Sequence, residues 1–323
     1  MIQKTRLPQE ARADLVRAGP FPVPQGAEVG VTHTVDGVAL RYACWRADAP
    51  RREALALILQ GRTEFIERYG ETISLLLARG FDVMSFDWRG QGGSQRLLPH
   101  SKKGHVGSFD DYGRDLETIL SIADEHSSSA PRYVLAHSMG GAILLNELSK
   151  GPIKIKRGIL SAPMIGLSMV RAPRVAHLFA NVFSALGFHT SYVPRGNDNP
   201  LMEFENNPLT PDPLRFGISR TILSEAPDLA IASPTIGWVK TSFDAMVRLQ
   251  DPQTAQNIST PLLFVAGPHD RITDTQATER FVAHLRNGKL LKLEDAEHEI
   301  LLEHDALRHQ FWKAFDEFVF LGA

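Results

Sequence analysis

Residues 133–141 read Tyr-Val-Leu-Ala-His-Ser-Met-Gly-Gly, and they are the clearest indication of the fold in this sequence. The apolar run before Ser138 is typical of a buried strand, and the residues after it have helical spacing. A serine at such a sharp strand-to-helix turn is strained, and its hydroxyl projects above the sheet. The residues two before and two after it must be small, because strand and helix nearly touch. Gly140 meets this requirement and Ala136 exceeds it by one methyl group. A buried serine at an ordinary turn is the alternative.

Strand-like and helical segments alternate along the chain around this turn. Residues 30–35 and 38–45 flank Asp36-Gly37, which is a strong hairpin signal. Further strands are predicted at residues 54–59, 81–86, 133–136, 155–160, 261–266 and 289–293, with helices at 64–79, 110–123, 139–148, 275–285 and 306–320. The alternation predicts an α/β fold with a mostly parallel eight-stranded sheet and helices on both faces.

Residues 165–245 interrupt this alternation, because they contain helical segments but no convincing strand. We interpret them as a helical cap inserted into a core made of residues 28–164 and 246–323. Residues 1–27 are polar and contain four prolines, which indicates an arm lying on the surface.

An apolar stripe runs along one predicted helix of the cap. We expect it to pack against the domain below, as most such stripes do. Lining an acyl-chain tunnel and dipping into a lipid interface are open alternatives. The stripe consists of Val175, Leu178, Phe179, Val182 and Leu186.

A serine hydroxyl needs a base, and the base needs a carboxylate to orient it. Asp270 follows the strand at 261–266, and His298 follows the strand at 289–293. The order Ser, Asp, His is the one expected when the nucleophile sits on this kind of turn. We therefore predict a catalytic triad of Ser138, Asp270 and His298. Asp274 is the local competitor, but it better suits the N-cap of the next helix.

Acyl transfer also needs two N–H donors for the developing oxyanion. The amide after the nucleophile, Met139, is the first predicted donor. The second is the Arg62 amide, in the loop after the strand at 54–59, where Gly61 permits a sharp turn. Gly61 and Gly140 are thus the turn-forming residues, although a plain glycine turn is the alternative for Gly61.

Composition excludes several other classes of function. A formal net charge of −2 provides no field for nucleic acid, so no such partner is expected. One cysteine, Cys44, rules out an internal disulfide. His298-Glu299 lacks the second histidine of a zinc protease, because residue 302 is Leu302. The predicted mechanism requires no metal and no organic cofactor.

The N-terminal residues contain no apolar run of signal-peptide or membrane-spanning length. We therefore expect a cytoplasmic protein, and peripheral contact with the inner membrane stays open. The oligomeric state is not predicted.

With these residues in view, the chain resembles the bacterial lysophospholipase and monoglyceride-lipase group of α/β hydrolases, which are serine aminopeptidase-like hydrolases. The resemblance spans roughly residues 30 to 320. It departs from the group at Gln60, where many relatives have histidine, and at Ala136, where most have glycine. The segments that carry it are Gly61-Arg-Thr-Glu64, Asp87-Trp-Arg-Gly-Gln-Gly-Gly-Ser94, Phe109-Asp-Asp-Tyr112, His137-Ser-Met-Gly-Gly141 and His298-Glu-Ile-Leu-Leu-Glu303.

This resemblance implies an α/β-hydrolase fold and hydrolysis of a single-chain lipid ester, either a lysophospholipid or a monoacylglycerol. A small-ester carboxylesterase, or an aminopeptidase or amidase on the same triad, is the main alternative. An aminopeptidase needs acidic cap residues for the substrate ammonium, and Glu203 and Glu205 are the candidates. A relative that binds ligand without catalysis is a more remote alternative.

Overall fold

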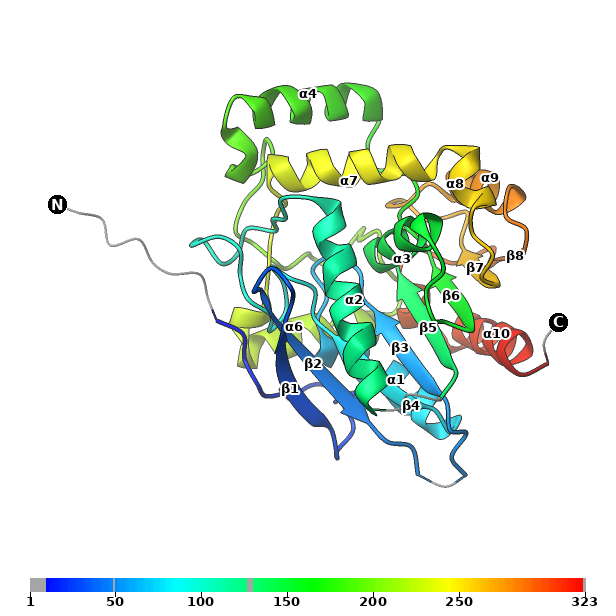
Figure 1. Cartoon of the computed structure of the whole chain (residues 1–323). Coiled ribbons are helices and arrows are strands. Elements are labelled where there is room, and N and C mark those ends of the chain that lie inside the picture. The colour runs from blue at the N-terminus through cyan, green and yellow to red at the C-terminus, as the bar shows by residue number, and fades with distance from the viewer. Residues whose placement is uncertain (1–9, 49, 127–129, 322–323) are drawn as a thin grey trace.

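A computed structural model describes residues 10–48, 50–126 and 130–321 (Figure 1). The first nine residues of the expected N-terminal arm lie outside this range. Within the described residues, eight strands form one sheet in the order β1-β2-β4-β3-β5-β6-β7-β8. The strands are β1 Glu28–His33, β2 Ala39–Trp45, β3 Leu55–Leu59, β4 Asp82–Phe86, β5 Arg132–His137, β6 Arg157–Ser161, β7 Leu262–Ala266 and β8 Gly288–Lys292.

The sheet is mostly parallel, as predicted. Only the β1–β2 and β2–β4 pairings are antiparallel, and every other neighbouring pair is parallel. β1 and β2 form the expected hairpin, in which Gly37 adopts a φ of 82° and the Thr34 amide donates to the Val38 carbonyl at 3.0 Å. The carboxyl ends of β3, β5, β6, β7 and β8 therefore share one edge of the sheet.

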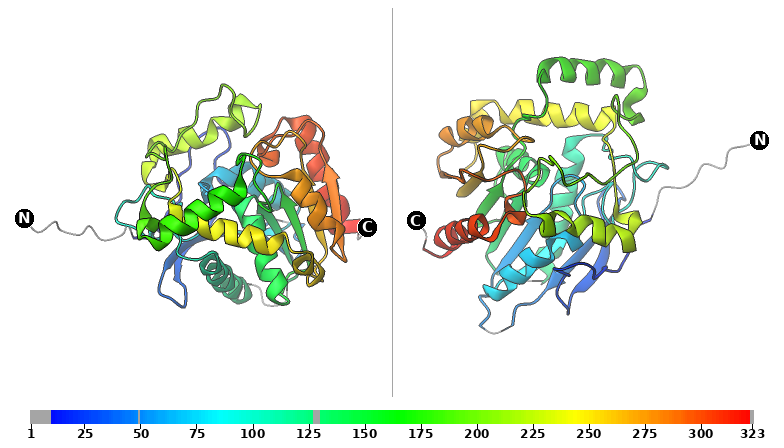
Figure 2. Two further views of the ribbon diagram at one scale, coloured as in Figure 1. Left: turned by 90° about the horizontal axis from the view of Figure 1, so that it is seen from above. Right: turned by 180° about the vertical axis from the view of Figure 1, so that it is seen from behind.

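Helices cover both faces because the central strands bury both of their faces. On β3, Leu57 faces one core cluster and Ile58 the other, and both are fully buried. α2 and α3 lie in front of the sheet in Figure 1. α1 and α10 lie on the other face and are in front in the right-hand view of Figure 2, which is seen from behind. The helices flanking the sheet are α1 Gly70–Ala78, α2 Phe109–His126, α3 Met139–Lys150, α8 Pro252–Gln256, α9 Thr275–Ala283 and α10 Asp305–Asp316.

The helix expected at residues 64–79 begins differently. A 3₁₀ turn, η1 Ile66–Tyr69, precedes α1. The Ile66 amide donates to the Asp87 carboxylate at 3.0 Å, so a side chain replaces the first helical hydrogen bonds. The last helix likewise ends in a π turn, η5 Glu317–Leu321.

Between β6 and β7 the described chain contains helices and irregular segments but no strand, as expected for residues 165–245. α4 lies on the outside of the molecule and packs on α7, which in turn contacts α2 and α3 (Figure 1). The expected boundary at residue 245 falls inside α7. The elements are α4 Pro173–Ala185, η2 Phe188–Thr190, α5 Pro213–Phe216, α6 Ile218–Glu225, η3 Pro227–Leu229 and α7 Ile236–Leu249.

The expectation that the α4 stripe packs against the core is wrong. Val175, Leu178, Val182 and Leu186 expose 66%, 64%, 47% and 66% of their surface. The inward side of α4 instead carries small or polar residues. Ala180 is buried, and His177 bonds to Asp244 of α7 at 2.7 Å. Phe179 is the partly buried member of the stripe and stacks on Phe183.

Arg41 of β2 ties the N-terminal arm to the sheet. Its guanidinium is fully buried and bonds to the Glu67 carboxylate at 2.7 Å and the Asp87 carboxylate at 2.8 Å. It also donates to the Asp14 carbonyl at 2.8 Å. The described part of the arm, residues 10–27, therefore lies against the domain.

No helix in residues 10–48, 50–126 and 130–321 is long and apolar enough to cross a membrane.

Candidate active site

The turn predicted at residues 133–141 forms at the carboxyl end of β5. Ser138 is the first residue before α3 and adopts φ 49° and ψ −113°, and such a positive φ is rare for residues with a side chain. A Cβ at Gly140 would lie 2.3 Å from the Leu59 carbonyl oxygen, so only glycine lets α3 approach β3 this closely. Ala136 is accommodated within the buried strand. The strain of the turn is thus enforced by packing on both sides.

The structure brings Ser138, His298 and Asp270 together as predicted. His298 Nε2 lies 3.1 Å from Ser138 Oγ, and His298 Nδ1 lies 2.9 Å from Asp270 Oδ2. All three residues are buried. With a proton on Nδ1, the imidazole donates to Asp270 and accepts from the serine hydroxyl. This is the relay that activates a serine.

Asp270 is fixed by several donors besides His298. Its Oδ1 accepts from the Ile272 and Thr273 amides at 2.7 and 2.9 Å, and its Oδ2 accepts from the Thr273 hydroxyl at 2.5 Å. Burial opposes ionisation, but the bonds to His298 and Thr273 outweigh it and lower the pKa of Asp270. The carboxylate therefore stays ionised. Asp274 instead caps α9 by accepting from the Ala277 amide, as predicted.

The same charges act on the base. Burial alone would lower the pKa of His298, but the bond and the charge of Asp270, together with Glu299 and Glu64, raise it above the ordinary value of 6.5. The surroundings of His298 therefore favour its protonated form.

Of the two predicted oxyanion donors, Met139 adjoins Ser138 in the chain, and Arg62 lines the same cavity as Ser138. Met139 opens α3, and Arg62 follows Gly61 in the loop after β3. Among the described residues, no acceptor pairs with the amide of Arg62 or of Met139. A Cβ at Gly61 would lie 2.8 Å from the Glu64 carboxylate, which explains why this position of the loop lacks a side chain.

Side chains from two motifs hold this loop in place. The Glu64 carboxylate accepts from the Gly61 amide and from the Tyr69 hydroxyl. The Gln91 amide donates to the Gly61 carbonyl at 2.9 Å, and the Trp88 indole donates to the Gln60 carbonyl at 2.9 Å. The sequence marked Glu64, Trp88 and Gln91 only as parts of a resemblance. Their role depends on contacts that no local pattern contains.

A buried charged cluster lies behind the histidine. Arg68 bonds to Glu299 at 2.7 Å and lies 3.6 Å from Glu64, while His137 Nε2 lies 3.4 Å from Glu299. Burial disfavours the ionised form of Glu299, but Arg68, His137 and His298 outweigh it and lower its pKa. Glu64, His137 and Glu299 could together offer ligand atoms to a metal ion. Because Arg68 already pairs with Glu299 and lies close to Glu64, we assign the three groups to a network of ion pairs and hydrogen bonds.

Ser138 and His298 open into a cavity of about 670 Å³. Most of its lining is apolar and comes from the segments between β6 and β7. Such a lining suits a hydrocarbon chain, with polar groups gathered at the reacting end. The apolar lining residues include Met164, Leu167, Val170, Leu209, Phe216, Leu223, Ile231, Trp238, Val239 and Phe243.

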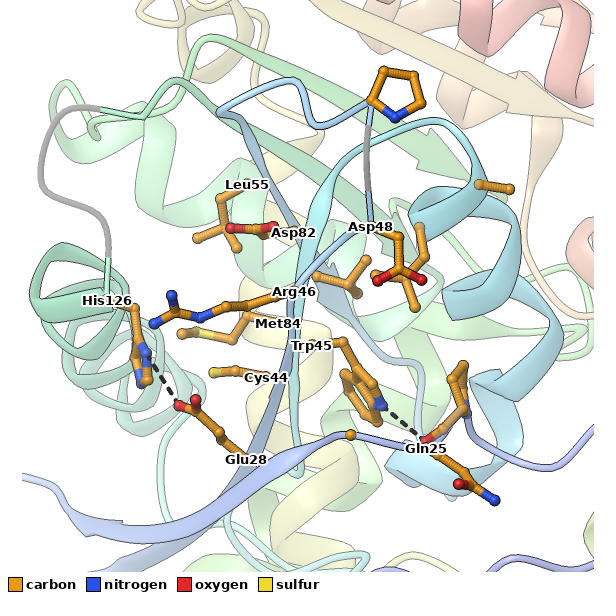
Figure 3. A pocket seen from close by; sticks show the side chains of 16 residues that line it. Gln25, Glu28, Cys44, Trp45, Arg46, Asp48, Leu55, Asp82, Met84 and His126 are labelled. Atoms are coloured by element: carbon orange, nitrogen blue, oxygen red, sulfur yellow. Dashed lines mark hydrogen bonds and ion pairs between the residues drawn. The ribbon is translucent and has the colours of Figure 1, made fainter.

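A second cavity, of about 460 Å³, lies at the opposite end of the sheet, where β3 and β4 begin (Figure 3). Glu28 and His126 approach each other across it, with 3.8 Å between Glu28 Oε2 and His126 Nδ1. Burial raises the pKa of the Cys44 thiol in its wall to about 12, so the thiol is no nucleophile at neutral pH. This cavity contains none of the predicted site residues.

A Ser–His–Asp relay at the carboxyl ends of β5, β7 and β8, on a mostly parallel sheet with this strand order, defines an α/β hydrolase.

Comparison with known protein families supports the assignment to the α/β hydrolases. The sequence model of the serine aminopeptidase family S33 matches residues 50–305, so the chain belongs to that family. The relatives include lysophospholipase L2 of Escherichia coli (strain K12), which is 32% identical over 85% of this chain and 82% of the relative. A probable lysophospholipase L2 of Haemophilus influenzae is 29% identical over 87% of this chain and 88% of its own length.

Solved structures share the fold. A soluble variant of monoglyceride lipase from Saccharomyces cerevisiae, solved with a substrate analogue, superposes with a TM-score of 0.75 at 20% identity. The superposition covers 93% of this chain and 97% of the yeast chain. The α/β-hydrolase fold predicted from the sequence is confirmed.

Proposed function

We propose that this hydrolase cleaves the carboxylic ester of a single-chain lipid, a lysophospholipid or a monoacylglycerol, through an acyl-enzyme on Ser138. The observation that carries this proposal is the hydrogen-bonded relay of Ser138, His298 and Asp270 at the base of a largely apolar cavity. The cavity provides a place for one hydrocarbon chain. The names of the relatives point to the same substrates.

In the first step, Ser138 Oγ attacks the ester carbonyl while His298 Nε2 accepts its proton. Asp270 holds the imidazole by its Nδ1–H and stabilises the imidazolium. The amides of Arg62 and Met139 receive the oxyanion. His298 then protonates the leaving alcohol, and the acyl group stays on Ser138.

In the second step, His298 removes a proton from water, and the resulting hydroxide attacks the acyl carbonyl. The same two amides stabilise the second oxyanion. Return of the proton from His298 to Ser138 Oγ releases the fatty acid and restores the enzyme. None of these steps requires a metal or an organic cofactor.

In this proposal, residues 165–245 act as a cap over the reacting groups. Lining residues such as Leu167, Leu209 and Trp238 come from this segment, whereas Ser138 and His298 belong to the core. The cap thus supplies the surface that meets the acyl chain and decides its fit.

An aminopeptidase function has less support from the geometry. Glu203 and Glu205, the candidate ammonium ligands, are exposed and do not line the cavity. The carboxylates that line it are those of Glu64 and Glu299, and both already lie within ion-pair distance of Arg68.

Peripheral contact with a lipid surface fits the exposed side of α4 as part of this proposal. Val175, Leu178, Val182 and Leu186 form an uninterrupted apolar face on the outermost helix. Arg171 and Arg174, both exposed, precede this face at the start of the helix and provide positive charge for anionic lipid head groups.

The test is fatty-acid release measured by mass spectrometry. The panel contains a lysophospholipid, a monoacylglycerol, a short nitrophenyl ester and an amino-acid amide, with Ser138→Ala as the control. We expect the wild-type protein to prefer the two long single-chain lipids, and the control to lose this activity. Turnover of only the short ester or the amide would sink the lipid proposal. Failure of a fluorophosphonate to label Ser138 would favour a non-catalytic relative.

A further inference from the structure

The side chain of Arg62 is an unusual cation in the catalytic cavity. It lies against Trp238, with 5.0 Å between the guanidinium carbon and the ring centroid, and its Nη2 donates to the Ala232 carbonyl. Its Nε is buried without a hydrogen-bond partner. No carboxylate within residues 10–48, 50–126 and 130–321 forms an ion pair with it.

This arrangement is costly unless an anion completes it. A charged group taken out of water is disfavoured unless it is paired and hydrogen-bonded. Burial lowers the pKa of Arg62 to about 10, so the group still carries its charge at neutral pH. By contrast, Arg41 and Arg89, which are more deeply buried, each bond to two carboxylates.

Arg96, a buried residue, also lacks a carboxylate partner among the described residues. Its guanidinium nitrogens donate to the carbonyls of Ser101, Ser94 and Asp228. Arg96 is therefore satisfied within the chain, and it does not line the catalytic cavity. Arg62 differs in both respects.

The other cations of the cavity are already paired. Arg68 bonds to Glu299, and the exposed Arg220 lies 3.4 Å from Glu203. The position of Arg62 is also defined by its surroundings, because a Cβ at Gly104 would lie 2.5 Å from its Nη2. The fold thus keeps space for one unpaired guanidinium in the cavity that Ser138 and His298 also line.

We propose that Arg62 binds the phosphate of a lysophospholipid head group and makes the enzyme prefer that lipid to a neutral monoacylglycerol. The inference rests on the proposed function. The Arg62 amide is the proposed oxyanion donor, so its side chain starts beside the scissile carbonyl. In a lysophospholipid only the glycerol separates that ester from the phosphate. A guanidinium offers the paired donors that a phosphate accepts.

The test compares the two lipid classes at one acyl-chain length. The kcat/KM for a lysophosphatidylethanolamine is divided by that for the matching monoacylglycerol. In Arg62→Met, which keeps the apolar stem, we expect this ratio to fall about 10- to 100-fold. Arg62→Lys keeps a charge without the fork, and its ratio should fall less. The matched control is Arg220→Met, a second cation of the same cavity, whose ratio should stay at the wild-type value.

Three other results of these measurements would overturn the proposal. An equal loss on both lipids in Arg62→Met would assign Arg62 to the structure of the oxyanion loop and overturn the proposal. An equal shift in Arg220→Met would attribute the preference to general charge and also overturn it. Reaction with a fluorophosphonate verifies that Ser138 is still competent. If Arg62→Met does not fold, an unchanged ratio in Arg62→Lys overturns the proposal.

Two further arms separate related explanations. Inorganic phosphate, at a concentration equal to the KM for the lysophospholipid, should not inhibit the wild-type enzyme. Strong inhibition at that concentration would show that free phosphate is the ligand of Arg62. If the wild-type protein hydrolyses neither lipid, the proposed function itself has failed. If it hydrolyses both and the ratio is insensitive to Arg62, only this inference has failed.

Discussion

At the scale of single residues, Ser138 holds its hydroxyl on a backbone that disfavours any side chain. Its φ of 49° is positive, a value that glycine adopts without strain. Beside Ser138, Gly140 allows α3 to pack closely against β3. The strain is retained because it places Oγ above the sheet, within 3.1 Å of His298.

Because of this strain, we expect glycine at position 138 to give a more stable, though inactive, protein than alanine at that position. Ser138→Gly should unfold with a free energy about 1 kcal/mol higher than Ser138→Ala, because glycine accepts the positive φ. Urea denaturation of the two variants measures the difference, and both should lack esterase activity. Equal stabilities would indicate that the turn stores no strain.

The charges around His298 predict the pH profile. The raised pKa of His298 means that the imidazole is protonated, and unable to act as a base, over a wider acid range than ordinary histidine. The kcat/KM should therefore rise with pH around an apparent pKa above 6.5. Asp270→Asn removes the bond and the charge that raise this pKa, so the acid limb should move to lower pH.

The same variant should lose about 10⁴-fold in kcat, because the wrong tautomer of the imidazole is then favoured. Steady-state kinetics on a soluble nitrophenyl ester from pH 5 to 9 measure both effects. An acid limb that stays at the wild-type position in Asp270→Asn would show that another group titrates.

At the scale of elements, one buried guanidinium joins the arm, β2, η1 and the loop after β4. Arg41→Leu would leave the carboxylates of Glu67 and Asp87 buried without their cation. We expect the free energy of unfolding to fall by about 3–5 kcal/mol. The matched control is Arg51→Leu, which breaks a largely exposed pair with Asp82 and should cost less than about 1 kcal/mol.

Urea denaturation followed by circular dichroism compares these two variants. A similar loss of unfolding free energy in both variants would mean that the buried ion pairs of Arg41 stabilise the fold no more than the Arg51–Asp82 pair does.

The outer face of α4 predicts binding to lipid surfaces. Replacing Leu178 and Val182 together by glutamate puts charge on that face and should weaken binding to anionic phospholipid vesicles at least about 10-fold. Sedimentation with vesicles measures the bound fraction. Val247→Glu is the control, because Val247 is 56% exposed on another helix. Equal binding by the control and the double variant would remove α4 from the contact.

At the scale of the whole molecule, local patterns predicted the sheet and the relay. Residues 54–59 were predicted to form a buried strand because they are a short apolar run, and β3, Leu55–Leu59, is buried along its whole length. Asp270 and His298 could be placed because each follows such a run, and strands of a parallel sheet bring their carboxyl ends together.

Long-range contacts explain what the sequence left undetermined. The larger apolar residues of α4 drew the prediction to the wrong side of the helix, because the packed side uses the small Ala180 and the polar His177 rather than Leu178. The loop-holding bonds join Glu64 and Gln91, two residues that come together only when the sheet forms. The unpaired state of Arg62 is likewise visible only in three dimensions.

The proposed mechanism requires a covalent acyl-enzyme at Ser138. The most direct measurement is peptide mass spectrometry after rapid acid quenching of the enzyme with a lysophospholipid. We expect the fatty acyl group on the peptide that contains Ser138, and its absence in Ser138→Ala. An acyl group on another residue, or turnover of the lipid by Ser138→Ala, would contradict the account.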